Sequence, residues 1–268
     1  MTEDGFDFAV IGGGSGGVAA ANRAASYGAK VALFEPDRLG GTCVNRGCVP
    51  KKLSWLAAYT AERLRNAEGY GFEPVEARHD FGKLRAARDR YIEHLNDRYA
   101  EGLAKNGVTL VREHARFEDA HTLAAGQQRL RAEHILIATG AHPRALAIPG
   151  GELALDSDDF FKLDRRPERV ALIGAGYIAA EFGGIFAALG SHVDIYLGGR
   201  EILAHFDPFV RDVMTQAAEG DDPWVLSAGT IDIFFAITQT GTISLGVDGE
   251  LANEVTQTLR LGLAPSQT

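Results

Sequence analysis

This sequence contains few of the features that mark secreted, membrane-spanning or nucleic-acid-binding proteins. Only two of its 268 residues are cysteines, which excludes the dense disulfide framework of small secreted domains. The chain has no apolar run of transmembrane length, and its acidic first residues are unlike a secretory signal peptide. A formal net charge of −9 argues against nucleic acid or an anionic membrane as a partner. We therefore expect a cytoplasmic protein.

The remaining composition is that of an ordinary globular protein, with 46% hydrophobic and 24% charged residues. The length is sufficient for one large domain or two ordinary ones. An apolar run followed by a glycine-rich turn occurs twice, beginning at Phe8 and at Val170. The two copies lie about 160 residues apart, which is roughly one domain length. The repeat predicts two related nucleotide-binding domains in tandem.

The first copy has the pattern of a dinucleotide site. An apolar run at residues 6–11 leads into G-x-G-x-x-G at residues 12–17, and an alanine-rich segment at residues 18–28 favours a helix. A strand at residues 30–34 then ends in Glu35. Glycines permit a tight turn and a close backbone approach, and the helix N-terminus faces a pyrophosphate. The Glu35 carboxylate can accept hydrogen bonds from ribose hydroxyls and would repel a 2′-phosphate. A purely structural turn is the alternative, but the strand, helix and acid all have the spacing of a nucleotide site.

Both cysteines, Cys43 and Cys48, lie in one segment soon after this turn, residues 40–52. They can be redox-active, or they can be small buried residues, or zinc ligands that would need further histidine or cysteine partners nearby. Residues five apart in an ideal helix have Cα atoms roughly 8–9 Å apart, whereas a disulfide needs about 4.4–6.8 Å. Pairing therefore requires a distorted segment, and Gly47 with Pro50 provides the means.

The residues around the cysteines carry a family resemblance. Gly-Gly-Thr-Cys, four residues, then Cys-Val-Pro-Lys-Lys, behind a glycine-rich turn, resembles the pyridine nucleotide–disulfide oxidoreductases. The Pro-Lys-Lys ending looks most like the glutathione reductases of that family, and residues 70–72 and 90–99 are similar to their helical region. The resemblance extends from residue 6 to about residue 207.

The resemblance implies unequal roles for the two thiols. Cys48 would face the flavin as the charge-transfer thiolate, and Cys43 would attack the substrate disulfide. Lys51 would lie near flavin N5, and together with Lys52 it would favour the thiolate by its charge. The residues implied in FAD binding are Gly12, Gly14, Ser15, Gly16, Gly17, Glu35, Gly41, Thr42, Lys51, Ala115, Thr139 and Gly140.

The second copy of the pattern is Gly-Ala-Gly-Tyr-Ile-Ala at residues 174–179, in which Ala179 occupies the third glycine position. The resemblance implies that Glu181 pairs with Lys51 and that Tyr177 covers the nicotinamide pocket. A solvated helix acid and a packing tyrosine are the alternatives. The residues expected to bind the second nucleotide are Gly174, Ala175, Gly176, Ile178, Glu181 and Arg200.

The coenzyme preference is less well defined by the pattern. A 2′-phosphate site needs arginines, and the glutathione reductase pattern places them where this chain has Gly198 and Ala204, so that Arg200 alone remains close by. An NAD site needs an acid at the end of the second strand, and that position is Leu197. We expect NADPH, with NADH possible and an unusually small preference between the two.

Beyond residue 212 the resemblance fades. Residues 230–237 and 242–247 are β-rich and suit the antiparallel strands of an NADPH domain, and Gly262 belongs to a degraded Gly-Arg-x-Pro motif that would contact the cofactor. Relatives continue into a second FAD segment and a dimerisation domain that carries a His-Glu acid–base pair. We expect this chain to lack both regions and, with them, the catalytic acid–base group.

These observations lead to one fold prediction and one leading hypothesis. We expect an α/β protein of two Rossmann-like three-layer domains, FAD-binding at residues 1–149 and NAD(P)H-binding at residues 150–268, with a helical insertion at residues 53–102. The leading hypothesis is a metal-free, FAD-dependent reductase that uses NADPH to reduce glutathione disulfide or another small disulfide. Its relatives are homodimers. The alternatives are a catalytically impaired nucleotide-binding remnant and a dihydrolipoamide dehydrogenase-like enzyme, against which Lys52 argues.

Overall fold

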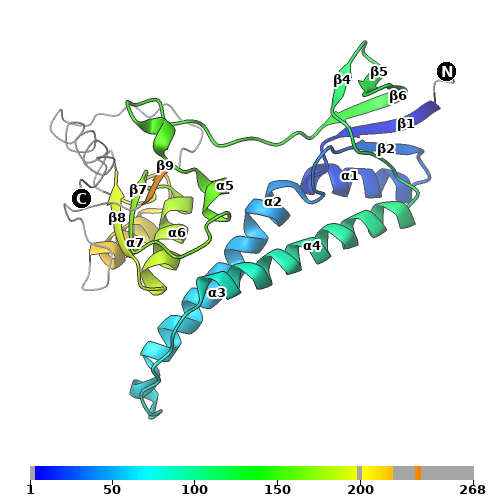
Figure 1. Cartoon of the computed structure of the whole chain (residues 1–268). Helices are drawn as coiled ribbons and strands as arrows, with labels where there is room; N and C mark the ends of the chain where they lie inside the picture. Colours follow the sequence, from blue (N-terminus) through cyan, green and yellow to red (C-terminus); the bar gives the residue numbers. More distant parts are fainter. Residues whose placement is uncertain (1–3, 198–200, 220–232, 237–268) are drawn as a thin grey trace, which may run out of the picture. The chain divides into compact units, whose positions relative to one another are not determined.

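The computed structural model describes residues 4–197, 201–219 and 233–236. The chain divides into two compact units, one formed by Met1–Lys52 with Ala86–His142 and the other by Leu53–Arg85 with Pro143–Thr268 (Figure 1). Each unit contains one of the two glycine-rich turns. None of the helices in the described ranges combines the length and the apolarity needed to cross a bilayer.

The first unit is built on a six-stranded sheet in the order β3-β2-β1-β6-β5-β4. Strands β3, β2, β1 and β6 run parallel, and β5 and β4 extend the sheet in the antiparallel direction. All four residues of β2 are buried, as expected for a parallel strand that is covered on both faces. The strand bounds are β1 Asp4–Ile11, β2 Val31–Phe34, β3 Thr109–Val111, β4 Ala115–Phe117, β5 Thr122–Ala125 and β6 Gln128–Ile137.

Helices α1 (Ser15–Ser26) and α4 (Phe81–Lys105) pack on one face of this sheet. Val18 of α1 and Leu103 of α4 share a buried cluster with Val10 and Leu33 of the strands. The next strand residues point to the other face, where Ala9 and Phe34 join a second cluster with β5 and β6. This alternation is the ordinary consequence of strand geometry, and it places the first glycine-rich turn between β1 and α1.

The second unit contains a three-stranded parallel sheet in the order β8-β7-β9. Its core joins Val170 and Leu172 of β7 to Phe182 and Phe186 of α6, and Phe160 stacks on Phe182 with ring centroids 3.9 Å apart. Parallel strands joined to helices in both units confirm the predicted α/β class. The bounds are β7 Arg169–Ile173, β8 His192–Tyr196, β9 Ile233–Ala236, η2 Gly151–Leu153, α5 Ser157–Phe160, α6 Tyr177–Ala188 and α7 Pro208–Glu219.

Strand β9 corrects one expectation. The β-rich composition after residue 225 predicts antiparallel strands, whereas β9 pairs in parallel with β7, with Val170 opposite Ile233 and Ile173 opposite Ala236. Continuous apolar runs suit buried strands of either direction, so composition alone does not define the direction. The predicted strand at residues 242–247 lies outside the described residues.

The helical segment predicted at residues 53–102 is present as α3 (Cys48–Arg65), η1 (Ala67–Tyr70) and α4, but it divides between the units. Ala57, Ala58 and Ala61 of α3 pack against the core of the second unit. The division of the chain therefore differs from the expected single boundary near residues 149–151, because the first part of the insertion packs with the second unit.

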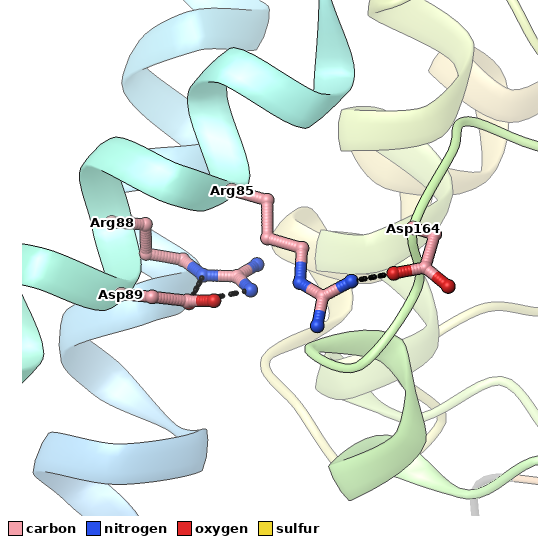
Figure 2. A network of polar contacts seen from close by, with 4 residues as sticks. All are labelled: Arg85, Arg88, Asp89 and Asp164. Carbon is pink, nitrogen blue, oxygen red and sulfur yellow. Dashed lines mark hydrogen bonds and ion pairs between the residues drawn. The ribbon is translucent and has the colours of Figure 1, made fainter.

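Charged contacts accompany this division in α4. Arg85, in the first turns of α4, forms an ion pair with Asp164, which lies in the segment after α5 (Figure 2). The guanidinium of the buried Arg88 donates from Nε and Nη2 to Oδ1 of Asp89, over 3.0 and 2.9 Å. Arg85 and Asp164 both belong to the second unit, whereas residues from Ala86 onward belong to the first.

Candidate nucleotide and dithiol site

The first glycine-rich turn, residues 12–17, joins β1 to α1 and leaves no room for side chains on its inner side. Gly12 has a φ of 108°, and a Cβ atom there would lie 2.3 Å from the carbonyl oxygen of Ala138. A Cβ atom on Gly17 would lie 1.9 Å from the carbonyl oxygen of Gly12. A Cβ atom on Gly16 would meet nothing within 4 Å. The turn is therefore closed toward the sheet and open at the start of the helix.

This open side fits an anionic group. Gly14 is the N-cap residue of α1, and no side chain caps the helix at that position. The next two residues, Ser15 and Gly16, are exposed. The first amides of a helix attract phosphate through their free N–H groups and the helix dipole. The residues present therefore fit the pyrophosphate of a dinucleotide such as FAD.

Glu35 follows β2 and binds the turn itself. Its Oε2 atom accepts a hydrogen bond from the Gly13 N–H over 2.7 Å, and its Oε1 atom accepts one from Asp37 N–H over 2.9 Å. Each carboxylate oxygen can accept a further bond, so ribose hydroxyls can still bind there. The two backbone contacts hold the half-buried carboxylate in place beside the turn.

A returning segment, residues 39–41, lies against the same turn. The Gly40 N–H donates to the Gly13 carbonyl oxygen over 2.8 Å, and Gly40 forms a parallel bridge with Gly14. A Cβ atom on Gly41 would lie 2.6 Å from Gly14 Cα. The segment that leads into the cysteines is therefore in backbone contact with the nucleotide turn.

Two asparagines that sequence reasoning missed hold this returning segment. Asn96 of α4 donates to the Leu39 carbonyl oxygen over 2.8 Å and to Oδ1 of Asn45 over 3.0 Å. Asn45 of α2 (Gly41–Arg46) in turn donates to the Gly41 carbonyl oxygen over 2.9 Å. Both asparagines lie inside the motif segments, but a side-chain contact across 51 residues has no local sequence signature.

The cysteines lie on two helices separated by a sharp break. Cys43 is in α2, and α3 begins at Cys48 after Gly47, whose φ and ψ are −149° and −118°. A Cβ atom on Gly47 would lie 2.8 Å from the Thr42 carbonyl oxygen, so the chain folds back closely at this point. Pro50 lies in the first turn of α3, where its missing N–H removes no helical hydrogen bond. The distortion that pairing requires is thus present at Gly47.

Cys43 and Cys48 are not joined by a disulfide in this structure, and Cys43 is half-buried whereas Cys48 is exposed. Hydrogen bonding with the Cys43 side chain, burial and the charge of Cys43 raise the pKa of Cys48, in that order. A backbone hydrogen bond and the charge of Lys51 lower this pKa to a smaller extent. The pKa of Cys48 is therefore raised overall, although the lysines are expected to lower it, because the influence of Cys43 is larger than that of Lys51.

The second glycine-rich turn, residues 174–179, joins β7 to α6 with the same backbone pattern. The Gly174 N–H donates to the Tyr196 carbonyl oxygen over 2.8 Å, as the Gly12 N–H does to Phe34 over 2.8 Å. The helix N-cap is again a glycine without a side-chain cap. The second turn therefore also presents free helix amides to an anionic group.

The side chains around the second turn are placed as follows. Tyr177 is exposed at the first position of α6, and Glu181 is half-buried one turn later. Leu197, after β8, is half-buried, and Ala204 is exposed. Gly198, Arg200 and Gly262 lie outside the described residues. Lys51 and Glu181 belong to different units, so their pairing stays a prediction.

The remaining predicted FAD contacts lie on two parts of the first unit. Thr139 and Gly140 follow β6, and a Cβ atom on Gly12 would lie 3.2 Å from Thr139 Cα. Ala115 begins β4, the edge strand of the six-stranded sheet. Within the described part of the chain, no group of three or more histidine, cysteine, aspartate or glutamate side chains converges as a metal site would.

Comparison with known proteins agrees with this geometry. Residues 6–225 match the pyridine nucleotide-disulphide oxidoreductase family model. The chain is 46% identical over 216 residues to a glutathione reductase of Schizosaccharomyces pombe, which covers 77% of this chain and 47% of that protein. It is 44% identical over 224 residues to the glutathione reductase of Yarrowia lipolytica, a match that covers 78% of this chain and 48% of that protein. It is 42% identical over 220 residues to the glutathione reductase of Nostoc sp., a match that covers 82% of this chain and 47% of that protein. The chain spans about half the length of these curated relatives. It belongs to the pyridine nucleotide-disulphide oxidoreductase family.

Proposed function

We propose that this chain forms the electron relay of a glutathione reductase, from NADPH through FAD to the Cys43–Cys48 pair. The observation that carries the proposal is the backbone contact between the first glycine-rich turn and the segment that enters the cysteine helix. Gly40 bridges Gly14, and Cys43 follows three residues after Gly40. A flavin nucleotide bound at the turn would therefore lie on the same structural unit as the dithiol.

The chain's own residues have distinct parts in this proposal. The free amides at the start of α1 bind the FAD pyrophosphate, and Glu35 accepts hydrogen bonds from its ribose. The free amides at the start of α6 bind the pyrophosphate of the coenzyme. Tyr177 covers the nicotinamide side of that site, and Glu181 pairs with Lys51 near the flavin. When bound, NADPH and FAD supply a hydride-transfer couple that returns the cysteine disulfide to the dithiol.

The dithiol chemistry balances with glutathione disulfide as the oxidant. The Cys43 thiolate attacks one sulfur of the substrate, its S–S bond breaks, and the first glutathione leaves and takes up a proton. The Cys48 thiolate then attacks Cys43 Sγ, which releases the second glutathione and closes the Cys43–Cys48 disulfide. The two thiol protons of the enzyme thus appear on the two glutathione products. Another small disulfide would react by the same steps.

The coenzyme of this relay is proposed to be NADPH, with NADH as a usable substitute. Leu197 after β8 carries no charge, so it neither repels a 2′-phosphate nor binds a free ribose as a carboxylate would. Ala204, where the glutathione reductase pattern has an arginine, offers no charged contact to the phosphate. We further propose a cytoplasmic location.

The experiment is an anaerobic titration of the purified, flavin-loaded chain with NADPH. The proposal predicts a long-wavelength absorbance band that is absent in Cys48→Ser, together with NADPH oxidation on addition of glutathione disulfide. A chain that takes up no flavin and oxidises no NADPH would instead be a nucleotide-binding remnant. Turnover with dihydrolipoamide but not with glutathione disulfide would reassign the substrate.

A further inference from the structure

The two glycine-rich turns share a contact that the G-x-G-x-x-G pattern does not include. In the first unit, the Gly40 N–H donates to the carbonyl oxygen of Gly13, the second residue of the turn, over 2.8 Å. In the second unit, the Leu203 N–H donates to the carbonyl oxygen of Ala175, also the second residue of its turn, over 2.8 Å. In each unit this donor lies a few residues beyond the strand that follows the turn and its helix, and Leu203 is therefore the counterpart of Gly40.

The two donors also share an unusual backbone conformation. Gly40 has a φ of 93°, and Leu203 has a φ of 59°. Among the described residues, Leu203 is the one non-glycine residue with a positive φ. Glycine adopts this conformation freely, whereas the Cβ atom of leucine makes it unfavourable. The second unit therefore has the same contact, although leucine disfavours the positive φ that the contact requires.

Neighbouring contacts hold Leu203 in this conformation. The Ile202 N–H donates to Oγ1 of Thr215 over 3.2 Å, and Glu201 forms an ion pair with Arg211 over 2.9 Å. Both partners lie on α7. The Leu203 side chain is buried in the core of the second unit. Three consecutive residues are thus anchored, and a strained conformation persists where its surroundings define it.

We propose that Leu203 is a positioning residue for the second nucleotide, because its left-handed backbone directs its N–H to the Ala175 carbonyl oxygen. This contact ties the second residue of the glycine-rich turn to the segment after β8, in which the next residue, Ala204, is exposed. In the first unit, Glu35 shares the task by accepting a hydrogen bond from Gly13, whereas Leu197 has no carboxylate with which to do so. The inference rests on the proposed role of the second turn in coenzyme binding.

The test compares Leu203→Val with Leu203→Asn in the full chain. Valine stays apolar but is β-branched and disfavours a positive φ strongly, whereas asparagine tolerates a positive φ but is polar. We expect Leu203→Val to weaken NADPH binding by about tenfold or more and Leu203→Asn to keep it within about threefold, although asparagine lowers the unfolding temperature more. Calorimetric NADPH titration and thermal unfolding of each variant give these two quantities.

A purely packing role predicts the opposite order, so tighter NADPH binding by Leu203→Val than by Leu203→Asn would overturn the inference. If Leu203→Val does not fold, Leu203→Gly is the second test variant, because glycine keeps the backbone N–H and adopts a positive φ freely. A folded Leu203→Gly protein with wild-type NADPH affinity supports the inference, and one that has lost NADPH binding contradicts it. If the wild-type chain binds neither NADPH nor NADH, the proposed function fails as well, whereas a reversed order in a chain that binds NADPH overturns the positioning role alone.

Discussion

The two glycine-rich turns share backbone hydrogen bonds but differ in their side chains, and three of the differing positions bear on nucleotide binding. Gly12 and Gly174 each donate to the last residue of the next strand over 2.8 Å. Around that shared frame, Gly17, Glu35 and Gly40 of the first unit correspond to Ala179, Leu197 and Leu203 of the second. The two units thus share one backbone frame, and we expect the side chain after the second strand to influence the choice of coenzyme.

The largest effect is expected at the third glycine position. Gly17→Ala places a Cβ atom 1.9 Å from the Gly12 carbonyl oxygen if nothing moves, so β1 and α1 must separate. We expect FAD binding to weaken by about 100-fold or more, in a flavin-release measurement that also records the unfolding temperature. The matched variant Ala179→Gly should cost only about 0.5–1 kcal/mol and keep coenzyme binding. Wild-type flavin affinity in Gly17→Ala would break the comparison.

A carboxylate after β8 should give the second turn the ribose-binding acid of the first turn and shift its coenzyme preference toward NADH. Leu197→Glu introduces the acid that Glu35 provides in the first unit. We expect the ratio of NADPH to NADH efficiency to fall by about tenfold or more, because the carboxylate repels a 2′-phosphate and accepts bonds from a free ribose. Steady-state kcat/KM with each coenzyme measures this ratio. Leu197→Gln is the uncharged control, and an equal fall in that variant would show that charge is not the cause.

The asparagine contacts predict a moderate effect on the stability of the first unit and on its FAD binding. Asn96→Ala removes the hydrogen bond to Leu39, which is partly buried, so we expect a loss of about 1–3 kcal/mol in unfolding free energy with weaker FAD binding. Asn106→Ala removes an exposed bond to Asn22 and should cost less than about 0.5 kcal/mol. Denaturant unfolding followed by flavin fluorescence measures the loss of unfolding free energy and of bound FAD in each variant. Equal losses in both variants would argue that Asn96 does not support the nucleotide turn.

The smallest predicted effect concerns the pH dependence of the dithiol. Because the Cys43 thiol raises the pKa of Cys48, less Cys48 thiolate is present at neutral pH than in an isolated cysteine, and the thiolate forms as pH rises. Cys43→Ala removes the main cause, so the midpoint of the alkylation rate against pH should move down. Lys51→Met removes a lowering influence and should move the midpoint up. A midpoint that does not respond to Cys43→Ala would contradict this influence of Cys43 on the pKa of Cys48.

The features predicted from sequence are those whose cause is local. Both glycine-rich turns and their flanking strands and helices occur where the pattern places them, because a tight turn with a close helix requires glycine at fixed spacing. The break between the cysteines occurs at Gly47, where a Cβ atom would lie 2.8 Å from the Thr42 carbonyl oxygen, so that the close fold of the chain favours glycine. In both cases the backbone conformation restricts which residue type can occupy the position.

The features that sequence did not predict depend on distant partners. Ala57, Ala58 and Ala61 pack with the second unit, and small apolar residues on a helix do not specify which core they join. The parallel direction of β9 depends on its pairing with β7. The left-handed Leu203 is held by α7 and by the core against its own preference. Each outcome is decided by contacts that only the folded chain brings together.

The most direct test of the relay counts the electrons that the oxidised, flavin-loaded chain accepts. A flavin and a disulfide each take two electrons, so dithionite titration should reach full reduction at four electrons per chain. Cys43→Ser cannot form the disulfide and should require two. A wild-type chain that is fully reduced by two electrons would show that Cys43 and Cys48 do not exchange electrons with the flavin, and this result would contradict the account.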